Sequence, residues 1–137
     1  MAISANEFKQ RLPQLCLTYS ANELPRRQRD RHIIFKSVTF YFDPGRSYSE
    51  TEVNSLIDSW KEQVGRTCNI DRVTLRRSLI DEGYLTRSAD GSAYTRLPDS
   101  GPQGMFEADV DAVDPALTIV EAVRDIEERR RKFGKEQ

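Results

Sequence analysis

A helix that begins near Ser49 is the feature that most constrains how this chain folds. Glu52 follows Ser49 by three residues, and this is the spacing of a capping box, in which two side chains bind the free backbone N–H groups at a helix start. Apolar residues then recur at helical spacing, namely Val53, Leu56, Ile57, Trp60 and Val64. Gly65 is placed to end the helix. The pattern predicts an amphipathic helix with one face on a core.

Another helix and a short strand are expected before Ser49. Residues 26–42 place Ile34, Val38 and Tyr41 on one helical face. Residues 38–42 also suit a strand, because β-branched and aromatic residues favour one. Asp43-Pro44-Gly45 is a clean stop signal, and it favours the helix. Residues 46–48 are then expected to form a very short strand.

A third helix and a hairpin are expected after Gly65. Asn69 or Asp71 can cap a helix over residues 71–82, and Gly83 follows it where a left-handed residue is often needed. Two short alternating runs, 84–87 and 92–96, flank a turn that contains Asp90-Gly91. The order helix, strand, helix, helix, hairpin is that of a winged helix. The predicted fold class is therefore α+β, mostly α, with a winged helix-turn-helix core of three helices and a β-hairpin.

Three segments flank this core, which spans residues 26–96. Residues 1–25 are expected to form a helical arm that starts at the Ser4 and Glu7 capping box and ends or kinks at Pro13. Residues 97–113 are rich in Pro, Gly and acidic residues, which is typical of a linker. Residues 114–137 are expected to form an amphipathic helix with i,i+4 ion pairs along its end. Its apolar face holds Ile119, Val120, Val123 and Ile126.

The net charge and its distribution along the chain give little information about the binding partner. The net charge is only −1, so composition alone does not indicate nucleic-acid binding. Residues 26–96 carry 13 Lys or Arg against 10 Asp or Glu, and residues 97–137 carry 6 against 10. A mildly basic middle and an acidic tail fit a nucleic-acid module, and they equally fit ordinary scatter.

The chain contains none of the usual signals of catalysis or of the membrane. Cys16, Cys68 and the single His32 cannot complete a zinc site, and the cysteines are expected to be reduced structural thiols. A glycine-rich phosphate loop and a nucleophile elbow are absent, so we expect neither an enzyme nor a cofactor or metal. Apolar runs are too short for a membrane span and no signal peptide is visible, which predicts a cytoplasmic protein.

Residues 24–96 resemble the domain-of-unknown-function family 2087. The resemblance rests on Leu24-Pro25-Arg26-Arg27, the run FDPGRSYSETEVN over 42–54, the run DRVTLRRSLIDEGYL over 71–85, and Arg87, Gly91, Tyr94 and Arg96. It implies a winged-helix-like bacterial domain that occurs alone or joined to transcription-regulator modules. It implies no settled biochemical activity.

The second helix of a helix-turn-helix enters the major groove of DNA, and here it would be residues 71–82. Its outer face holds Thr74, Arg77, Ser78 and Asp81, whereas Arg72 and Arg76 fall within the apolar face. Arg76 is expected to be structural and to pair with Asp30, Asp43 or Asp81, because a buried charge needs a partner. The candidate DNA-binding residues are Arg26, Arg27, Arg72, Thr74, Arg77, Ser78, Arg87 and Arg96.

Each candidate also has a structural interpretation. Arg77 is placed to pair with Asp81 at i,i+4, and the two hairpin arginines also suit a solubilising role. The cluster Arg26, Arg27, Arg29 and Arg31 opposes the macrodipole at a helix start, which hints at an anion, but these residues are also able to pair with Glu23, Asp30 or Asp43.

These patterns lead to two functional hypotheses. The first is a DNA-binding transcriptional regulator that contacts duplex DNA through the third helix, the wing and the arginine cluster, and that forms a homodimer through the 114–133 helix. The alternative is a winged-helix module for protein–protein interaction without nucleic-acid binding. The acidic linker, the C-terminal helix and the low net charge favour the alternative.

Overall fold

The computed structural model describes residues 1–18, 22–98 and 101–135. Its elements are α1 (Ala5–Pro13), the π-helical turn η1 (Gln14–Thr18), α2 (Gln28–Thr39), β1 (Ser47–Tyr48), α3 (Glu50–Gln63), α4 (Arg72–Asp81), β2 (Leu85–Arg87), β3 (Tyr94–Arg96), the 3-10 helix η2 (Ala108–Ala112) and α5 (Pro115–Lys135). The predicted α+β, mostly α class is confirmed. Parts of the predicted arm (19–21), linker (99–100) and C-terminal helix (136–137) lie outside the described residues.

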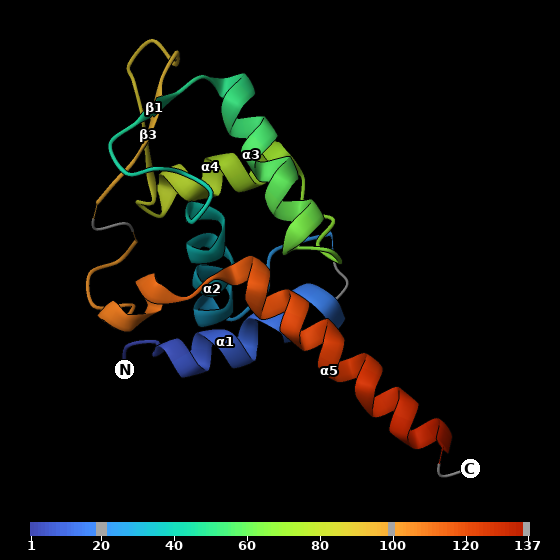
Figure 1. Cartoon of the computed structure of the whole chain (residues 1–137). Helices are drawn as coiled ribbons and strands as arrows, with labels where there is room; N and C mark the ends of the chain where they lie inside the picture. The colour runs from blue at the N-terminus through green and yellow to red at the C-terminus, as the bar shows by residue number, and fades with distance from the viewer. Residues whose placement is uncertain (19–21, 99–100, 136–137) are drawn as a thin grey trace.

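The sheet is small and antiparallel, with strand order β1-β3-β2. Strands β2 and β3 form the predicted hairpin, in which Thr86 faces Thr95. Strand β1 adds to the other edge of β3, where Tyr48 faces Tyr94. The sheet therefore joins the segment before α3 to the hairpin that follows α4, and it lies at the end of the molecule opposite α1 (Figure 1).

Local signals place the central helices as expected. Ser49 Oγ accepts from the Glu52 backbone N–H at 3.1 Å, and Glu52 Oε1 accepts from the Ser49 N–H at 3.0 Å, so the predicted capping box is present. At α1, Ser4 Oγ accepts from the Glu7 N–H. Gly83 follows α4 with φ of +82°, a conformation that glycine adopts without the steric cost of a Cβ.

The core surrounds α2, which crosses the middle of the molecule between α1 and α4 (Figure 1). Trp60 of α3 is fully buried and donates its indole N–H to Ser37 Oγ of α2 at 2.9 Å. Tyr84 is also buried, and its ring packs beside His32 and Phe35 of α2. Trp60 and Tyr84 thus each find a hydrogen-bonding partner on α2, as burial of their polar groups requires.

The predicted linker is ordered on the core wherever the structure describes it. The Ile3 N–H donates to the Met105 carbonyl at 2.7 Å, and the Glu107 N–H donates to the Ile3 carbonyl at 2.9 Å. Val110 and Val113 are buried around the short helix η2. The expectation of a linker is corrected for residues 101–113, which pack on the core. The sequence of this segment shows no helical or strand periodicity, because contacts with the N-terminus hold it in place.

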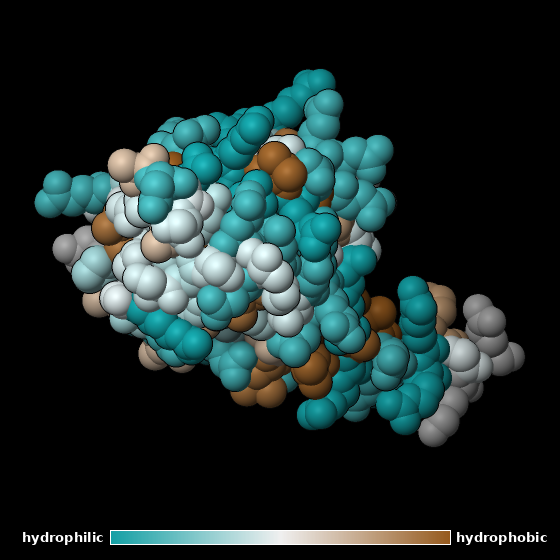
Figure 2. Space-filling model, turned by 90° about the horizontal axis from the view of Figure 1, so that it is seen from above, coloured by the Kyte–Doolittle hydropathy of each residue, from teal (hydrophilic) through white to brown (hydrophobic). Residues whose placement is uncertain are grey.

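Helix α5 begins at its predicted cap, where the Leu117 N–H donates to Asp114 Oδ1 at 3.1 Å. Its first half packs against α1 through the buried Ile119, and its second half projects away from the body (Figure 1). Val120, expected on the packed face, is instead 42% exposed. Hydrophobic side chains gather at the base of this projection on an otherwise mainly hydrophilic face (Figure 2). Within the described residues, no helix is both long and apolar enough to cross a membrane.

Candidate nucleic-acid interface

Helix α4 is held to the body by one narrow side. Leu75 and Leu79 are fully buried, and they lie one helical turn apart, so they anchor a single stripe of the helix. Helix α4 contacts α3 on one side and leads through Gly83 into strand β2. Arg72, Thr74 and Arg77 of this helix are exposed, whereas Arg76, Ser78 and Ile80 are half-buried. Val73 is 38% exposed.

Two arginines of α4 are bound to α3. Arg76 Nη2 lies 2.8 Å from Glu50 Oε1, and Arg76 Nη1 donates to Asn54 Oδ1 at 2.7 Å. The Arg76 side chain is only 12% exposed, so its expected structural role agrees with its position. Its partner is Glu50 and not one of the three expected aspartates, because α4 crosses the first turn of α3.

Arg72, a predicted DNA-binding residue, is also paired with α3. Its Nη1 donates to Asp58 Oδ2 at 3.1 Å, and both side chains are about half exposed. A salt bridge between two exposed groups is weak, roughly 0–1 kcal/mol. Arg72 is therefore held loosely against α3, and Asp58 neutralises much of the charge that Arg72 brings to this surface.

The opposite side of α4 presents the remaining predicted contacts. Thr74 and Arg77 are exposed, and Ser78 is half-buried. The alternative pairing of Arg77 with Asp81 is not formed, since no carboxylate in the described residues lies within 4.0 Å of its guanidinium. Arg77 is thus a cation on the solvent side of α4 with no ion-pair partner in the described part of the chain.

The hairpin carries one arginine at its tip. Arg87 is exposed, and its guanidinium lies 5.9 Å from the centre of the Tyr94 ring, within the range of a cation–π contact. The turn beside it is ordered by Asp90, whose carboxylate accepts from Ser88 Oγ and from the Ser92 N–H. These hydrogen bonds lower the pKa of Asp90 to about 2. The Arg87 guanidinium lies against this turn, because a Cβ added at Gly91 would meet it.

Arg96 is used inside the domain. Its Nη1 donates to the carbonyls of Thr39 and Phe42 at 3.0 and 2.9 Å, at the end of α2. Burial lowers the pKa of Arg96, and its buried Nε has no hydrogen-bonding partner among the residues that the structure describes. The guanidinium therefore binds carbonyls at the end of α2, and the predicted contact of Arg96 with DNA would require it to leave them.

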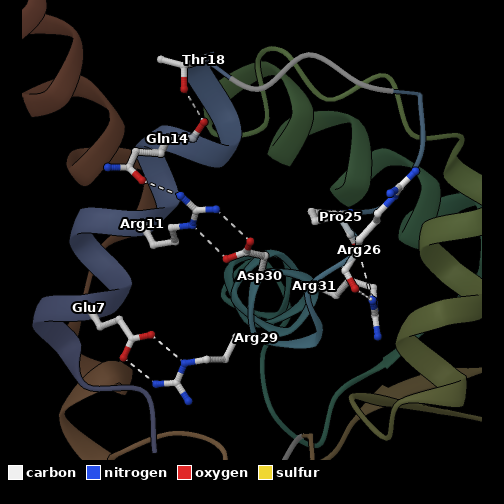
Figure 3. Close-up of polar contacts among 9 residues, drawn as sticks. All are labelled: Glu7, Arg11, Gln14, Thr18, Pro25, Arg26, Arg29, Asp30 and Arg31. Atoms are coloured by element: carbon white, nitrogen blue, oxygen red, sulfur yellow. Dashed lines mark hydrogen bonds and ion pairs between the residues drawn. The ribbon is translucent and has the colours of Figure 1, made fainter.

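The cluster before and within α2 divides into two groups (Figure 3). On the α1 side, Arg29 binds Glu7 through two hydrogen bonds, and Arg11 binds Asp30 in the same way. These hydrogen bonds lower the pKa of both carboxyl groups.

On the other side of α2, Arg31 donates to the Pro25 and Arg26 carbonyls. Arg26 and Arg27 are exposed, and neither forms an ion pair with a described residue. Arg26 and Arg27 are therefore the most exposed members of the cluster, whereas Arg29 and Arg31 are half-buried and bound to other groups.

Some residues of this surface were not identified from the sequence. Glu50 and Asn54 hold Arg76, but their roles depend on how two helices cross, which no local pattern records. Arg46 lies beside strand β1 with its guanidinium 5.0 Å from the centre of the Tyr48 ring, and it is 60% exposed. In the sequence, the one feature that could have indicated Arg46 as a surface residue is its position directly after the Asp43-Pro44-Gly45 turn. No cluster of three metal-ligating side chains occurs in the described ranges.

A family model described as "Uncharacterized protein conserved in bacteria" (DUF2087) matches residues 21–96, which is more than half of the chain. These residues run from just before α2 to the end of β3, so they include α3, α4 and the whole sheet. No curated protein and no solved structure matches the chain.

Proposed function

The chain belongs to the bacterial domain-of-unknown-function family 2087, and we propose that its family domain is a winged helix that binds duplex DNA. The order α2-β1-α3-α4-β2-β3, with strand order β1-β3-β2, supports this assignment. Helices α3 and α4 would form the helix-turn-helix, and the β2–β3 hairpin would form the wing. In that arrangement α4 is the helix that enters the major groove.

The proposal rests on one observation, which is that two arginines of α4 are paired with α3 and the third is exposed. Arg72 and Arg76 bind carboxylates of α3, whereas Arg77 lies exposed beside Thr74 with no ion-pair partner in the described residues. A helix that reads a groove needs polar and cationic side chains on its free face and firm anchoring on its other face. Arg26, Arg27 and Arg87 would add phosphate contacts, which position a protein on DNA without reading its sequence.

The proposal is tested by fluorescence anisotropy with a labelled random-sequence duplex at low salt. The variant Arg26→Ala/Arg27→Ala/Arg77→Ala should bind at least tenfold more weakly than the unmodified protein, because three cations are removed from the proposed DNA-binding face. The matched control is Arg129→Ala/Arg130→Ala/Arg131→Ala on the exposed second half of α5, which changes the net charge equally. Equal weakening by both variants would argue against a defined DNA-binding face.

A protein-interaction module is the second candidate. It is favoured by the arginines that are already paired, namely Arg11, Arg29, Arg72 and Arg76, and by the net charge of −1. Paired arginines have little charge left to attract a polyanion. Under this alternative, the titration at low salt would give no change in anisotropy for the unmodified protein.

The proposed function includes a homodimer formed through α5. Ile119, Ile126 and Phe133 follow one another at intervals of seven residues, so they lie along one side of the helix. Ile119 is buried against the body, whereas Phe133 is 71% exposed on the projecting half. A second copy would cover the exposed continuation of this stripe, and two DNA-binding domains would then face adjacent half-sites.

A further inference from the structure

The two cysteines of the chain are far apart in sequence and adjacent in space. Cys16 lies in η1, and its carbonyl accepts from the Thr67 N–H at 3.0 Å and from Thr67 Oγ1 at 2.9 Å. Cys68 follows in the loop between α3 and α4, with its Sγ 3.8 Å from the Leu15 carbonyl oxygen. Both residues are free thiols, and the hydrogen bonds between their two segments place them side by side.

The two thiols differ in exposure and in acidity. Cys16 is fully buried, whereas Cys68 keeps 7% of its surface exposed. The Cys16 thiol lowers the pKa of Cys68, burial opposes this shift, and the positive charge of Lys61 acts in the same direction as Cys16. The Cys68 thiol and burial both raise the pKa of Cys16. Cys68 is the less buried of the two thiols and the one whose pKa is lowered, so it suits the role of attacking cysteine, with Cys16 as the resolving cysteine.

We propose that Cys16 and Cys68 form a redox-sensitive dithiol that hydrogen peroxide converts to an intramolecular disulfide. The Cys68 thiolate attacks one peroxide oxygen, the O–O bond breaks, and a sulfenic acid and hydroxide are formed. The Cys16 sulfur then attacks the Cys68 sulfur, so that an S–S bond forms and the S–O bond breaks. The oxygen leaves as water with the Cys16 proton. In total, two thiols lose two protons and two electrons, and peroxide is reduced to two molecules of water.

The disulfide would link two parts of the chain that are otherwise joined by noncovalent contacts. Cys16 precedes the family domain at residues 21–96, and Cys68 lies within it. The bond would therefore fix the N-terminal arm to the loop that leads into α4. This chemistry depends only on the position of the two thiols, and it would occur whether or not α4 binds DNA.

The test treats the folded full-length protein with hydrogen peroxide, removes the oxidant, unfolds the protein in a thiol-alkylating reagent and measures its mass. The expected product is a monomer that is lighter by two hydrogen atoms, takes up no alkyl group, and yields a proteolytic fragment in which the Cys16 and Cys68 peptides are joined. Dithiothreitol should restore two alkylatable thiols.

Single variants provide the control for access of peroxide. In Cys16→Ala the reaction should stop at the Cys68 sulfenic acid, which dimedone captures, whereas Cys16 in Cys68→Ala should stay reduced. The proposal is overturned if the unmodified protein keeps both thiols alkylatable at a peroxide dose that oxidises Cys68 in Cys16→Ala. It is equally overturned if neither protein reacts, or if disulfides form only between chains.

Discussion

Arg76 and Arg77 are neighbours in the chain, but their surroundings differ. Arg76 is nearly buried and bound to Glu50 and Asn54, whereas Arg77 is exposed. Arg76→Ala should lower the free energy of unfolding by about 1–3 kcal/mol, because it removes two hydrogen bonds and a packed side chain. Arg77→Ala should change it by less than about 0.5 kcal/mol. Urea unfolding measures both, and equal effects would contradict the division of roles on α4.

His32 makes stability depend on pH near neutrality. Burial lowers the pKa of His32, and its Nδ1 lies 2.8 Å from the Tyr84 hydroxyl. The unfolded chain therefore binds a proton on His32 near pH 6.5, before the folded protein does. Above pH 6.5, the contribution of His32 to the free energy of unfolding should be constant. As the pH decreases below 6.5, this contribution should decrease by at most about 1.4 kcal/mol per pH unit, until the pKa of His32 in the folded protein is reached.

Urea unfolding between pH 8 and pH 5 measures this dependence, and His32→Gln is the control. His32 is the only histidine in the chain, so the variant should lose most of the slope in this range. An unchanged slope in His32→Gln would assign the pH dependence to another group. The carboxyl groups of Glu7 and Asp30 have lowered pKa values, so their contribution is lost only in more acidic solution.

At the residue scale, the sequence predicted which kind of environment Arg76 has but not its partner. A guanidinium on an apolar helix face needs a carboxylate, and this argument requires no structure. The choice of Glu50 depends on the crossing of α3 and α4, as does the pairing of Arg72 with Asp58. Contacts between helices are set by packing of the whole domain, so local patterns do not determine them.

At the scale of elements, segments with their own start and stop signals were predicted well. Helix α3 has the capping box at Ser49, α4 ends before Gly83, and Asp90-Gly91 lies in the turn of the hairpin. Residues 101–113 have no such signals. Their order comes from hydrogen bonds to Ile3 and from the burial of Val110, which are contacts with the opposite end of the chain.

The projecting half of α5 gives the prediction at this scale. If a second copy covers its apolar stripe, Phe133→Glu should shift the protein from dimer to monomer, because a carboxylate is costly to bury without a partner. Light scattering after size-exclusion chromatography measures the mass. Leu117→Glu is the control, since Leu117 is also exposed on α5 but lies off the stripe. An unmodified protein that is monomeric at all concentrations would exclude this dimer.

At the scale of the whole molecule, the low net charge is the main argument against DNA binding. The main argument in favour is the uneven distribution of the charged residues. The chain has a net charge of −1, but its acidic excess lies in residues 97–137. Arg26, Arg27, Arg77 and Arg87 are exposed and free of ion pairs within the described ranges. A protein of low net charge is able to bind DNA only if such a local group of cations faces the phosphates.

The salt dependence of DNA affinity tests the proposed DNA-binding function most directly. The affinity of the unmodified protein for a labelled duplex should be measured by anisotropy across a series of salt concentrations. Contacts from four arginines to phosphates predict that log K falls with log salt with a slope of about −3 to −4 per domain. Absence of binding at the lowest salt concentration, or an affinity that does not change with salt, would contradict a DNA-binding function for this domain.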